Sequence, residues 1–259
     1  MQINFVKYFI DKFRKKLKGN ASGSSGMISE EGYDIGTYLQ YHAYLKKFHD
    51  FLKPEVYVEI GVRNGDSLMY IHADTKAIAI DPMPVNNHNL PKNVHFFCET
   101  ADDFFVTHNI QKEFGSPIGL AFIDGMHLFD FALRDFINTE KNASRKSVII
   151  IHDTHPVDLI SSQRERKQSF WTGDMYKMVL ILNKYRPDLK VVNMDCALTG
   201  LCLVTNLDPY SRILIDNYSE IVNEYLALSY DEIKPEILNR SLIKVDELSD
   251  EIINSWLNN

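Results

Sequence analysis

The sequence lacks the features that mark several large classes of protein. It contains no run of 18 apolar residues, the length a helix needs to span a bilayer, and charges interrupt its first apolar segment, which excludes a secretory signal. It has three cysteines, Cys98, Cys196 and Cys202, and none of them forms a Cys-x-x-Cys pair. We therefore expect neither a zinc ribbon nor a disulfide framework, and interpret the cysteines as buried free thiols of a cytoplasmic protein.

An excess of positive charge is also missing. The chain carries 28 Lys and Arg against 35 Asp and Glu, a net charge of −7. Non-specific binding to nucleic acid requires a positive surface, so we expect no nucleic-acid partner. Hydrophobic residues make up 45% of the 259 residues, which is enough for one large α/β domain with additions.

The N-terminal segment departs from this acidic composition. Residues 1–18 contain six Lys and Arg, one acid (Asp11), and apolar residues at helical spacing. A short basic amphipathic helix of this kind has two interpretations: peripheral contact with an anionic membrane, or packing on the body or on a second subunit of a homo-oligomer. Residues 19–26 are rich in Gly and Ser and predict a flexible linker. We therefore divide the chain into this segment with its linker (1–26), a main domain (27–206) and a C-terminal helical extension (207–259).

Short apolar strands alternate with helical segments in the main domain. We expect strands over 56–60, 77–81, 94–98, 118–125, 147–153, 190–194 and 200–204, and helices over 35–52, 65–73, 127–140 and 175–185, the last capped by Asp174. His42 and His49 are expected at the surface or at an interface of the first helix, and residues 156–172 in a mobile loop. The alternation predicts an α/β fold: a doubly wound, mostly parallel, seven-stranded Rossmann-like sheet with an antiparallel last strand and helices on both faces.

A glycine turn follows the first strand, in the segment Glu59-Ile-Gly61-Val-Arg-Asn64-Gly65-Asp-Ser67. Such a turn brings backbone N–H groups and a helix N-terminus close to a ligand. Asp81 ends the second strand about 20 residues later, where an acid binds the ribose hydroxyls of a nucleoside. The alternatives are tight turn geometry for the glycines and a turn cap before Pro82 for Asp81. The turn lacks the Gly-x-Gly-x-x-Gly spacing of dinucleotide sites, which disfavours a nicotinamide enzyme.

A second cluster of polar residues follows the fourth and fifth strands. Asp124 and His127 come after one strand, and His152, Asp153 and His155 come after the other. Because parallel strands end at one edge of a sheet, these side chains should converge there. Two carboxylates with imidazoles suit a divalent cation such as Mg²⁺ or a general base. The alternatives are helix caps for the acids and structural hydrogen bonds for the histidines.

These motifs together resemble the class I S-adenosylmethionine-dependent methyltransferases, in particular the methyltransferase domain 24 group of small-molecule and sugar O-methyltransferases. Ile123-Asp124-Gly125-x-His127, His152-Asp153-Thr154 and Thr172-Gly173-Asp174-Met175-Tyr176-Lys177 carry the resemblance, together with the glycine turn and Asp81. The resemblance implies S-adenosylmethionine as cofactor, with a divalent cation in the metal-dependent branch. It implies that the cofactor is bound by Glu59, Gly61, Asn64, Gly65, Ser67, Asp81, Thr100, Ala101 and Asp124. Asp124 and Asp153 match the metal positions of that branch.

Three residues depart from the family pattern. Arg63 replaces the middle glycine of the cofactor turn, Met126 replaces a common acid, and Thr154 stands where the catechol-type branch has Asn. We predict methyl transfer to a hydroxyl of a small molecule or glycan, with His127, His152 and Asp153 as the catalytic residues. The cations and Trp171 of the loop 156–172 suit an anionic or sugar-like acceptor. The alternative is a non-catalytic cofactor-binding or scaffold protein, which the departures permit.

Overall fold

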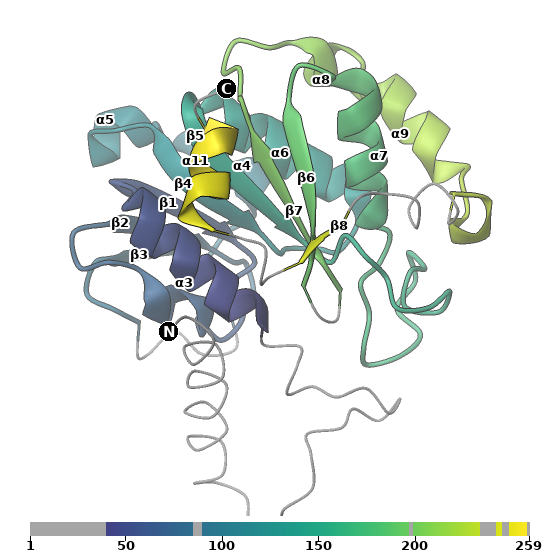
Figure 1. The fold of residues 1–259 in the computed structure, drawn as a ribbon, viewed down its shortest axis with the longest axis horizontal. Coiled ribbons are helices and arrows are strands. Elements are labelled where there is room, and N and C mark those ends of the chain that lie inside the picture. The colour runs from purple at the N-terminus through teal and green to yellow at the C-terminus, as the bar shows by residue number, and fades with distance from the viewer. Residues whose placement is uncertain (1–39, 85–89, 197–198, 234–241, 245–248, 258–259) are drawn as a thin grey trace, which may run out of the picture.

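An eight-stranded mixed sheet forms the centre of the protein in a computed structural model (Figure 1). The structure describes residues 40–84, 90–196, 199–233, 242–244 and 249–257. The expected basic helix, linker and start of the main domain lie outside these residues. Within them, no helix is both long and apolar enough to span a membrane.

The strand order is β3-β2-β1-β4-β5-β7-β6-β8. The strands are β1 (Val56–Ile60), β2 (Lys76–Ile80), β3 (Val94–Phe97), β4 (Ile118–Ile123), β5 (Ala143–His152), β6 (Lys190–Asp195), β7 (Leu201–Thr205) and β8 (Leu242–Lys244). β1 to β5 are parallel, whereas β7 pairs antiparallel with both β5 and β6. This confirms the predicted seven-stranded Rossmann-like sheet. β8 adds an eighth strand, parallel to β6, from the extension that we expected to be mostly helical.

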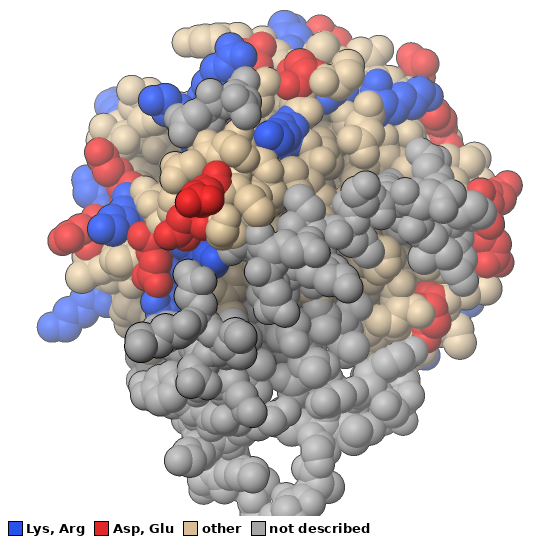
Figure 2. Space-filling model, in the orientation of Figure 1, with Lys and Arg blue, Asp and Glu red and all other residues tan. Residues whose placement is uncertain are grey.

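Helices cover both faces of the sheet and bury one apolar layer on each side. On one face lie α3 (Gln40–Leu52) and α11 (Asp250–Leu257), shown in purple and yellow in Figure 1. The other face is covered by α4 (Ala101–Thr107), α5 (Ile110–Phe114), α6 (Phe129–Lys141), α7 (Tyr176–Tyr185), α8 (Ile213–Asp216) and α9 (Tyr218–Leu226). Because β1, β4 and β5 are apolar on both sides, burial on both faces fixes the sheet in the middle layer. On the face drawn in Figure 2, cations and acids lie side by side.

Several local predictions were wrong. The helix expected over 65–73 is a single 3-10 turn, η1 (Ser67–Tyr70), because the chain becomes extended at Ile71. The Asn93 side chain then donates to the carbonyls of His72 and Thr75, which holds the return toward β2. The helix expected to open at His127 begins at Phe129.

Two expectations about burial also need correction. His42 and His49 are buried rather than at the surface, since the apolar face of α3 that packs on the sheet includes both rings. Cys196 and Cys202 are buried and outside any disulfide, as predicted, but Cys98 is exposed because it lies just beyond the end of β3.

Candidate cofactor and catalytic site

The carboxyl ends of β1, β2, β4 and β5 form one rim of the sheet. Register places Ile60 beside Ile80 and Ile123, and Ile123 beside Ile151. The polar residues that follow these strands therefore meet at the rim, as the topology requires for a ligand site of an open α/β sheet.

Glu59 is the buried acid of this rim, with 1% of its surface exposed. Its carboxylate accepts hydrogen bonds from the Tyr57 hydroxyl at 2.7 Å and from the Ser67 hydroxyl at 2.5 Å. Burial raises the pKa of Glu59 to about 7, although both hydrogen bonds favour the ionised form. A carboxyl balanced between its two forms is poised to respond to a cationic ligand.

The two glycines of the turn are needed for different contacts. Both have left-handed backbone, with φ of +86° at Gly61 and +73° at Gly65. A Cβ on Gly61 would lie 2.1 Å from the Asp124 carbonyl oxygen, and a Cβ on Gly65 would lie 2.4 Å from Leu90. Gly61 therefore allows the turns after β1 and β4 to touch, which brings the two parts of the rim together.

Asp81 holds the glycine turn from the neighbouring strand. One carboxylate oxygen accepts from the backbone N–H groups of Val62 (3.0 Å) and Arg63 (2.7 Å), and the other accepts from Met83 N–H (2.8 Å). Asp81 therefore also acts as the turn cap before Pro82 that we gave as the alternative to ligand binding. Each carboxylate oxygen has two lone pairs, so the same group retains acceptor capacity for a ligand hydroxyl.

The remaining predicted cofactor residues lie around this turn and at the start of α4. Asn64 is exposed, as is Arg63. Thr100 caps α4, because its hydroxyl accepts from Asp103 N–H at 3.1 Å. Ala101 is buried beside it as the first residue of the helix. The structure brings every predicted cofactor residue to the carboxyl edge of the sheet.

The second cluster is brought together as expected. His152 Nδ1 lies 3.0 Å from Asp124 Oδ1, and His127 Nε2 lies 3.4 Å from the same oxygen. Asp153 Oδ2 lies 3.0 Å from His127 Nδ1. His152 and Asp153 are buried, whereas His127 and Asp124 retain about a fifth of their side-chain surface, 22% and 19%. His127 is therefore the imidazole that an acceptor could reach.

Trp171 fixes the proton on His127. Its carbonyl lies 2.9 Å from His127 Nδ1 and can only accept, so Nδ1 carries a proton. The indole also stacks on the imidazole at 5.5 Å between ring centroids, and its own N–H donates to the Gln163 carbonyl. Nε2 is therefore the nitrogen of His127 that faces Asp124.

Charges inside the cluster reinforce one another. Burial alone would lower the pKa of His127, but the carboxylates of Asp153 and Asp124 raise it to about 9. The same carboxylates outweigh burial at His152 and raise its pKa above the ordinary value. In return, the imidazoles overcome burial at Asp124 and hold its pKa well below its usual range.

Asp124, His152 and Asp153 also fit a divalent cation. One ligand atom from each lies within 4.8 Å of the other two. Asp153 Oδ2 is buried and accepts no well-aligned hydrogen bond from a described residue, although it forms an ion pair with His127 Nδ1 at 3.0 Å. A cation held by all three residues would stabilise this buried carboxylate further. Two carboxylates and one imidazole suit a transition metal better than the all-oxygen shell that Mg²⁺ prefers.

The loop 156–172 has no regular helix or strand, as predicted, but it is tied to the site. Arg164 pairs with Asp130 at 2.8 Å and with Asp174 at 2.9 Å. We expected Asp174 to cap its own helix, α7, but it does not. Its carboxylate instead accepts from Phe129 N–H at the start of α6, 45 positions earlier in the chain. Arg164 therefore anchors the loop between two acids.

Sequence reasoning missed Tyr41 of α3, whose ring lies 4.4 Å from the His152 ring and stacks on Phe122. Its only signal was a place on the apolar face of the helix.

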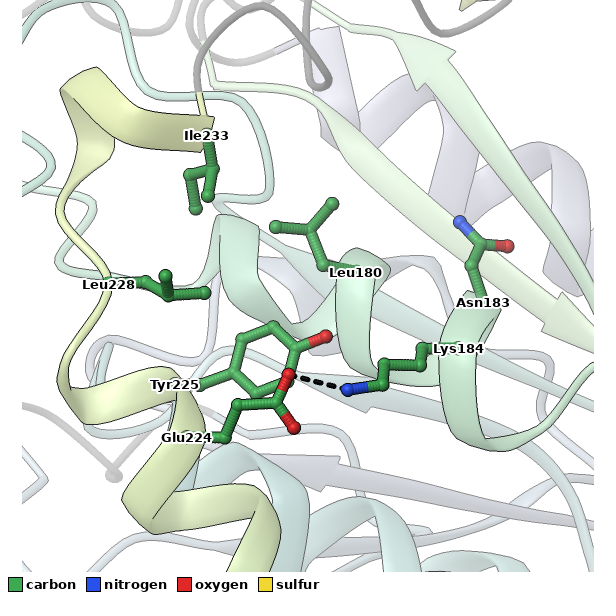
Figure 3. Close-up of a pocket in the computed structure, with 7 residues that line it drawn as sticks. All are labelled: Leu180, Asn183, Lys184, Glu224, Tyr225, Leu228 and Ile233. Atoms are coloured by element: carbon green, nitrogen blue, oxygen red, sulfur yellow. Dashed lines mark hydrogen bonds and ion pairs between the residues drawn. The ribbon is translucent and has the colours of Figure 1, made fainter.

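A cavity of about 380 Å³ lies away from the rim, between α7 and α9 (Figure 3). It is lined by Leu180, Asn183, Lys184, Glu224, Tyr225, Leu228 and Ile233 and contains none of the rim residues.

Comparisons with known proteins agree with this geometry. Residues 58–154 match a family model described as a methyltransferase domain, and this range contains the glycine turn, Asp81, Asp124, His127, His152 and Asp153. No curated protein matches the sequence.

Two similar solved structures share the fold. Cofactor-bound Rv0187 from MTB is 15% identical with a TM-score of 0.53, covering 64% of this chain and 79% of that one. The O-methyltransferase TomG from Streptomyces achromogenes, involved in tomaymycin synthesis and solved with S-adenosylmethionine, is 13% identical with a TM-score of 0.50, covering 65% and 80%.

Proposed function

We propose that this chain, whose residues 58–154 form a class I methyltransferase domain of the methyltransferase domain 24 group, methylates a hydroxyl group of a small molecule. The observation that carries the proposal is that two groups of residues meet at one rim of the sheet. The first half-site is the glycine turn with Glu59 and Asp81, and the second half-site is the cluster that contains Asp124 and His127. Gly61 packs against the Asp124 backbone, so the glycine turn and the cluster of Asp124, His127, His152 and Asp153 are neighbours.

The first half-site suits S-adenosylmethionine. The carboxyl of Glu59 lies buried below the turn and is matched to a cationic aminoacyl group. Asp81 would bind the ribose hydroxyls, and Thr100 and Ala101 would border the adenine. When bound, S-adenosylmethionine would supply the methyl group of its sulfonium to the acceptor oxygen, and the sulfur would retain the electron pair of the broken carbon–sulfur bond.

The second half-site would handle the acceptor proton. His127 is the more exposed imidazole, and Trp171 holds its Nδ1 proton, so Nε2 is the atom that would take the proton from the acceptor hydroxyl. Because the pKa of His127 is raised to about 9, only the neutral form, a minority at neutral pH, would act as this base, and the rate should rise as pH approaches 9. His152 is buried, and its Nδ1 faces Asp124. We therefore assign His152 to orienting Asp124 and Asp153 to holding the charge of His127. Most of the rate gain would come from positioning the acceptor oxygen in line with the methyl group.

A divalent cation would be held by Asp124, Asp153 and His152. Such an ion would lower the pKa of the acceptor hydroxyl and orient it. We propose that this ion assists the reaction, because Asp124, His152 and Asp153 each offer one ligand atom within 4.8 Å of the other two.

The acceptor class follows from what borders His127. Arg164 is committed to Asp130 and Asp174, which removes it from the cations available to an anionic substrate. Arg166 donates to carbonyls of its own loop, and Lys167 lies 3.9 Å from Glu165 on the exposed side of that loop. What remains next to His127 is the Trp171 indole and, on the adjoining turn, the Met126 side chain, which is 56% exposed. We therefore favour an acceptor with a flat or apolar body over a phosphorylated one.

The test combines binding with turnover. Calorimetry should show that the full chain binds S-adenosylhomocysteine, and labelled S-adenosylmethionine should methylate a member of a panel of phenols, catechols and sugars. The panel is run after chelation and again with Mg²⁺ or Mn²⁺. The double variant Asp124→Ala, Asp153→Ala should lose turnover by at least about a hundredfold. Asp250→Ala, on α11, is the matched control and should keep it.

Three outcomes separate the alternatives. Full turnover in the double variant would refute the assignment of metal and base. Binding without turnover over the whole panel would favour a cofactor-binding protein that is not an enzyme. A wild-type chain that does not bind S-adenosylhomocysteine would refute the methyltransferase proposal itself.

A further inference from the structure

Arg164, in the middle of the loop 156–172, joins the starts of two helices. Its Nη1 lies 2.9 Å from an oxygen of Asp174, and its Nη2 lies 2.8 Å from an oxygen of Asp130. Asp130 lies in the first turn of α6, and Asp174 lies just before α7 and is buried. Because a planar guanidinium can bind two acids at once, Arg164 ties the loop to both helices.

The two arms of the loop are hydrogen-bonded to each other beside Arg164. The indole N–H of Trp171 donates to the carbonyl of Gln163, the residue directly before Arg164. The backbone N–H and the hydroxyl of Thr172 both donate to the Ser161 carbonyl, each at 3.0 Å. An anchor at Arg164 therefore holds the returning arm of the loop, which contains Trp171, as well as the outgoing arm.

The returning arm lies against His127. A Cβ on Gly173, which has φ of +58°, would be 1.7 Å from the His127 carbonyl oxygen, so the two backbones touch there. The Trp171 carbonyl accepts from His127 Nδ1–H at 2.9 Å, and its indole stacks on the imidazole. Asp153 Oδ2 forms an ion pair with the same Nδ1 at 3.0 Å but accepts no aligned hydrogen bond from it. The loop therefore decides which of two oxygens accepts the Nδ1–H of His127.

We infer that Arg164 is a positioning residue for methyl transfer, because it holds the loop closed and thereby keeps the Trp171 carbonyl on His127. The inference rests on the proposed function. Without Arg164 the loop loses its bonds to α6 and α7, Trp171 moves off the imidazole, and the Nδ1–H turns toward Asp153. Rotation of the ring also turns Nε2, the atom that would take the acceptor proton. The residues proposed for the cofactor lie outside this loop, so cofactor binding should not depend on Arg164.

The first test separates turnover from cofactor binding. In Arg164→Met, kcat for an acceptor that the wild type methylates should fall at least about tenfold, because a small misplacement of a catalytic group is costly. The Kd of S-adenosylhomocysteine should stay within about threefold of the wild-type value. Arg164→Lys should recover part of kcat, since an ammonium lacks the fork that binds two acids at once. Lys167→Met, an exposed residue of the same loop with the same change in charge, is the matched control and should keep both values.

Two further measurements follow the loop without turnover. The chain has two tryptophans, so in a Trp256→Phe background the emission comes from Trp171 alone. Quenching of this emission by acrylamide should increase at least about twofold with Arg164→Met and should not increase with Lys167→Met. Nitrogen-15 NMR should show the Nδ1–H signal of His127, identified by its absence from His127→Gln. This signal should shift or broaden in Arg164→Met, whereas a merely structural role of Arg164 would leave it in place.

Wild-type kcat or unchanged quenching in a folded Arg164→Met would overturn the inference. An equal loss of kcat in Lys167→Met would overturn it as well, because the effect would then follow the charge of the loop. Should melting curves show that Arg164→Met does not fold, Asp130→Asn weakens the bond to α6 alone and is judged by the same criteria. A wild-type chain that methylates no acceptor would reject the proposed function, while the quenching and the Nδ1–H signal would still decide whether Arg164 holds Trp171 on His127.

Discussion

Replacement of Glu59 by Gln should remove a pH dependence from cofactor binding. Glu59 is fully buried, and burial raises its pKa to about 7. A cationic aminoacyl group beside it prefers the ionised carboxylate, so binding should lower this pKa and release protons. With a pKa near 7, about one site in eleven is ionised at pH 6 and about ten in eleven at pH 8, so affinity should rise about tenfold between them.

The assay is calorimetric titration of the full chain with S-adenosylhomocysteine at pH 6, 7 and 8 and constant ionic strength. Repeating the titration at pH 7 in buffers of different ionisation enthalpy should reveal release of about half a proton per ligand. Glu59→Gln retains the shape and can still hydrogen-bond to Tyr57 and Ser67. It should bind more weakly than the wild type at pH 8 and lose the tenfold slope.

The same pKa has a consequence for stability that serves as a control. A carboxyl whose pKa is higher in the folded chain stabilises it only at low pH, and this contribution is lost as pH rises from about 4.5 to 7. For Glu59 the difference amounts to about 3 kcal/mol. Without ligand, Glu59→Gln should therefore melt at a higher temperature than the wild type at pH 8. Equal pH slopes for the two proteins in the binding assay would refute the reasoning.

Two other predictions concern buried groups away from the rim. His49 is completely buried against Tyr57, and burial lowers its pKa to about 4, so acid should destabilise the fold by up to about 3 kcal/mol between pH 6.5 and 4. Denaturant unfolding of His49→Phe should show a smaller loss over that range; an unchanged loss would contradict this. Arg186 is buried with Glu140, and Arg186→Met should cost about 3–5 kcal/mol because it strands the acid. The exposed Arg212→Met should change stability by less than about 0.5 kcal/mol, and similar losses in both would contradict the argument.

The positions of β1, β2, β4 and β5 could be predicted because each has an apolar centre and a polar residue at or just beyond its carboxyl end. In β5, Val148 to Ile151 are buried, and the strand ends at His152. Parallel pairing then carries the acids after β1, β2, β4 and β5 to one edge without further information. This is why the convergence of Glu59, Asp81 and Asp124 could be derived before their contacts were known.

What the sequence did not reveal depends on partners far away in the chain. Asp174 had the local pattern of a helix cap, but the N–H that it accepts belongs to Phe129, and no local rule selects that partner. His49 follows Leu45 by four positions and so shares its buried helical face, although histidine is more often exposed than leucine.

Backbone strain identifies the same rim of the sheet independently of any family resemblance. Five residues other than glycine have positive φ in the described chain: Lys53, Arg63, His127, Asp153 and Asn206. Three of them, Arg63, His127 and Asp153, lie in the turns after β1, β4 and β5. Each such conformation costs about 1 kcal/mol or more, and persists only where surrounding contacts enforce it. Arg63 shows how: its N–H donates to Asp81, and its side chain is exposed, so the arginine that replaces the family's glycine keeps the backbone of a glycine turn. The departure therefore leaves the glycine turn after β1 intact.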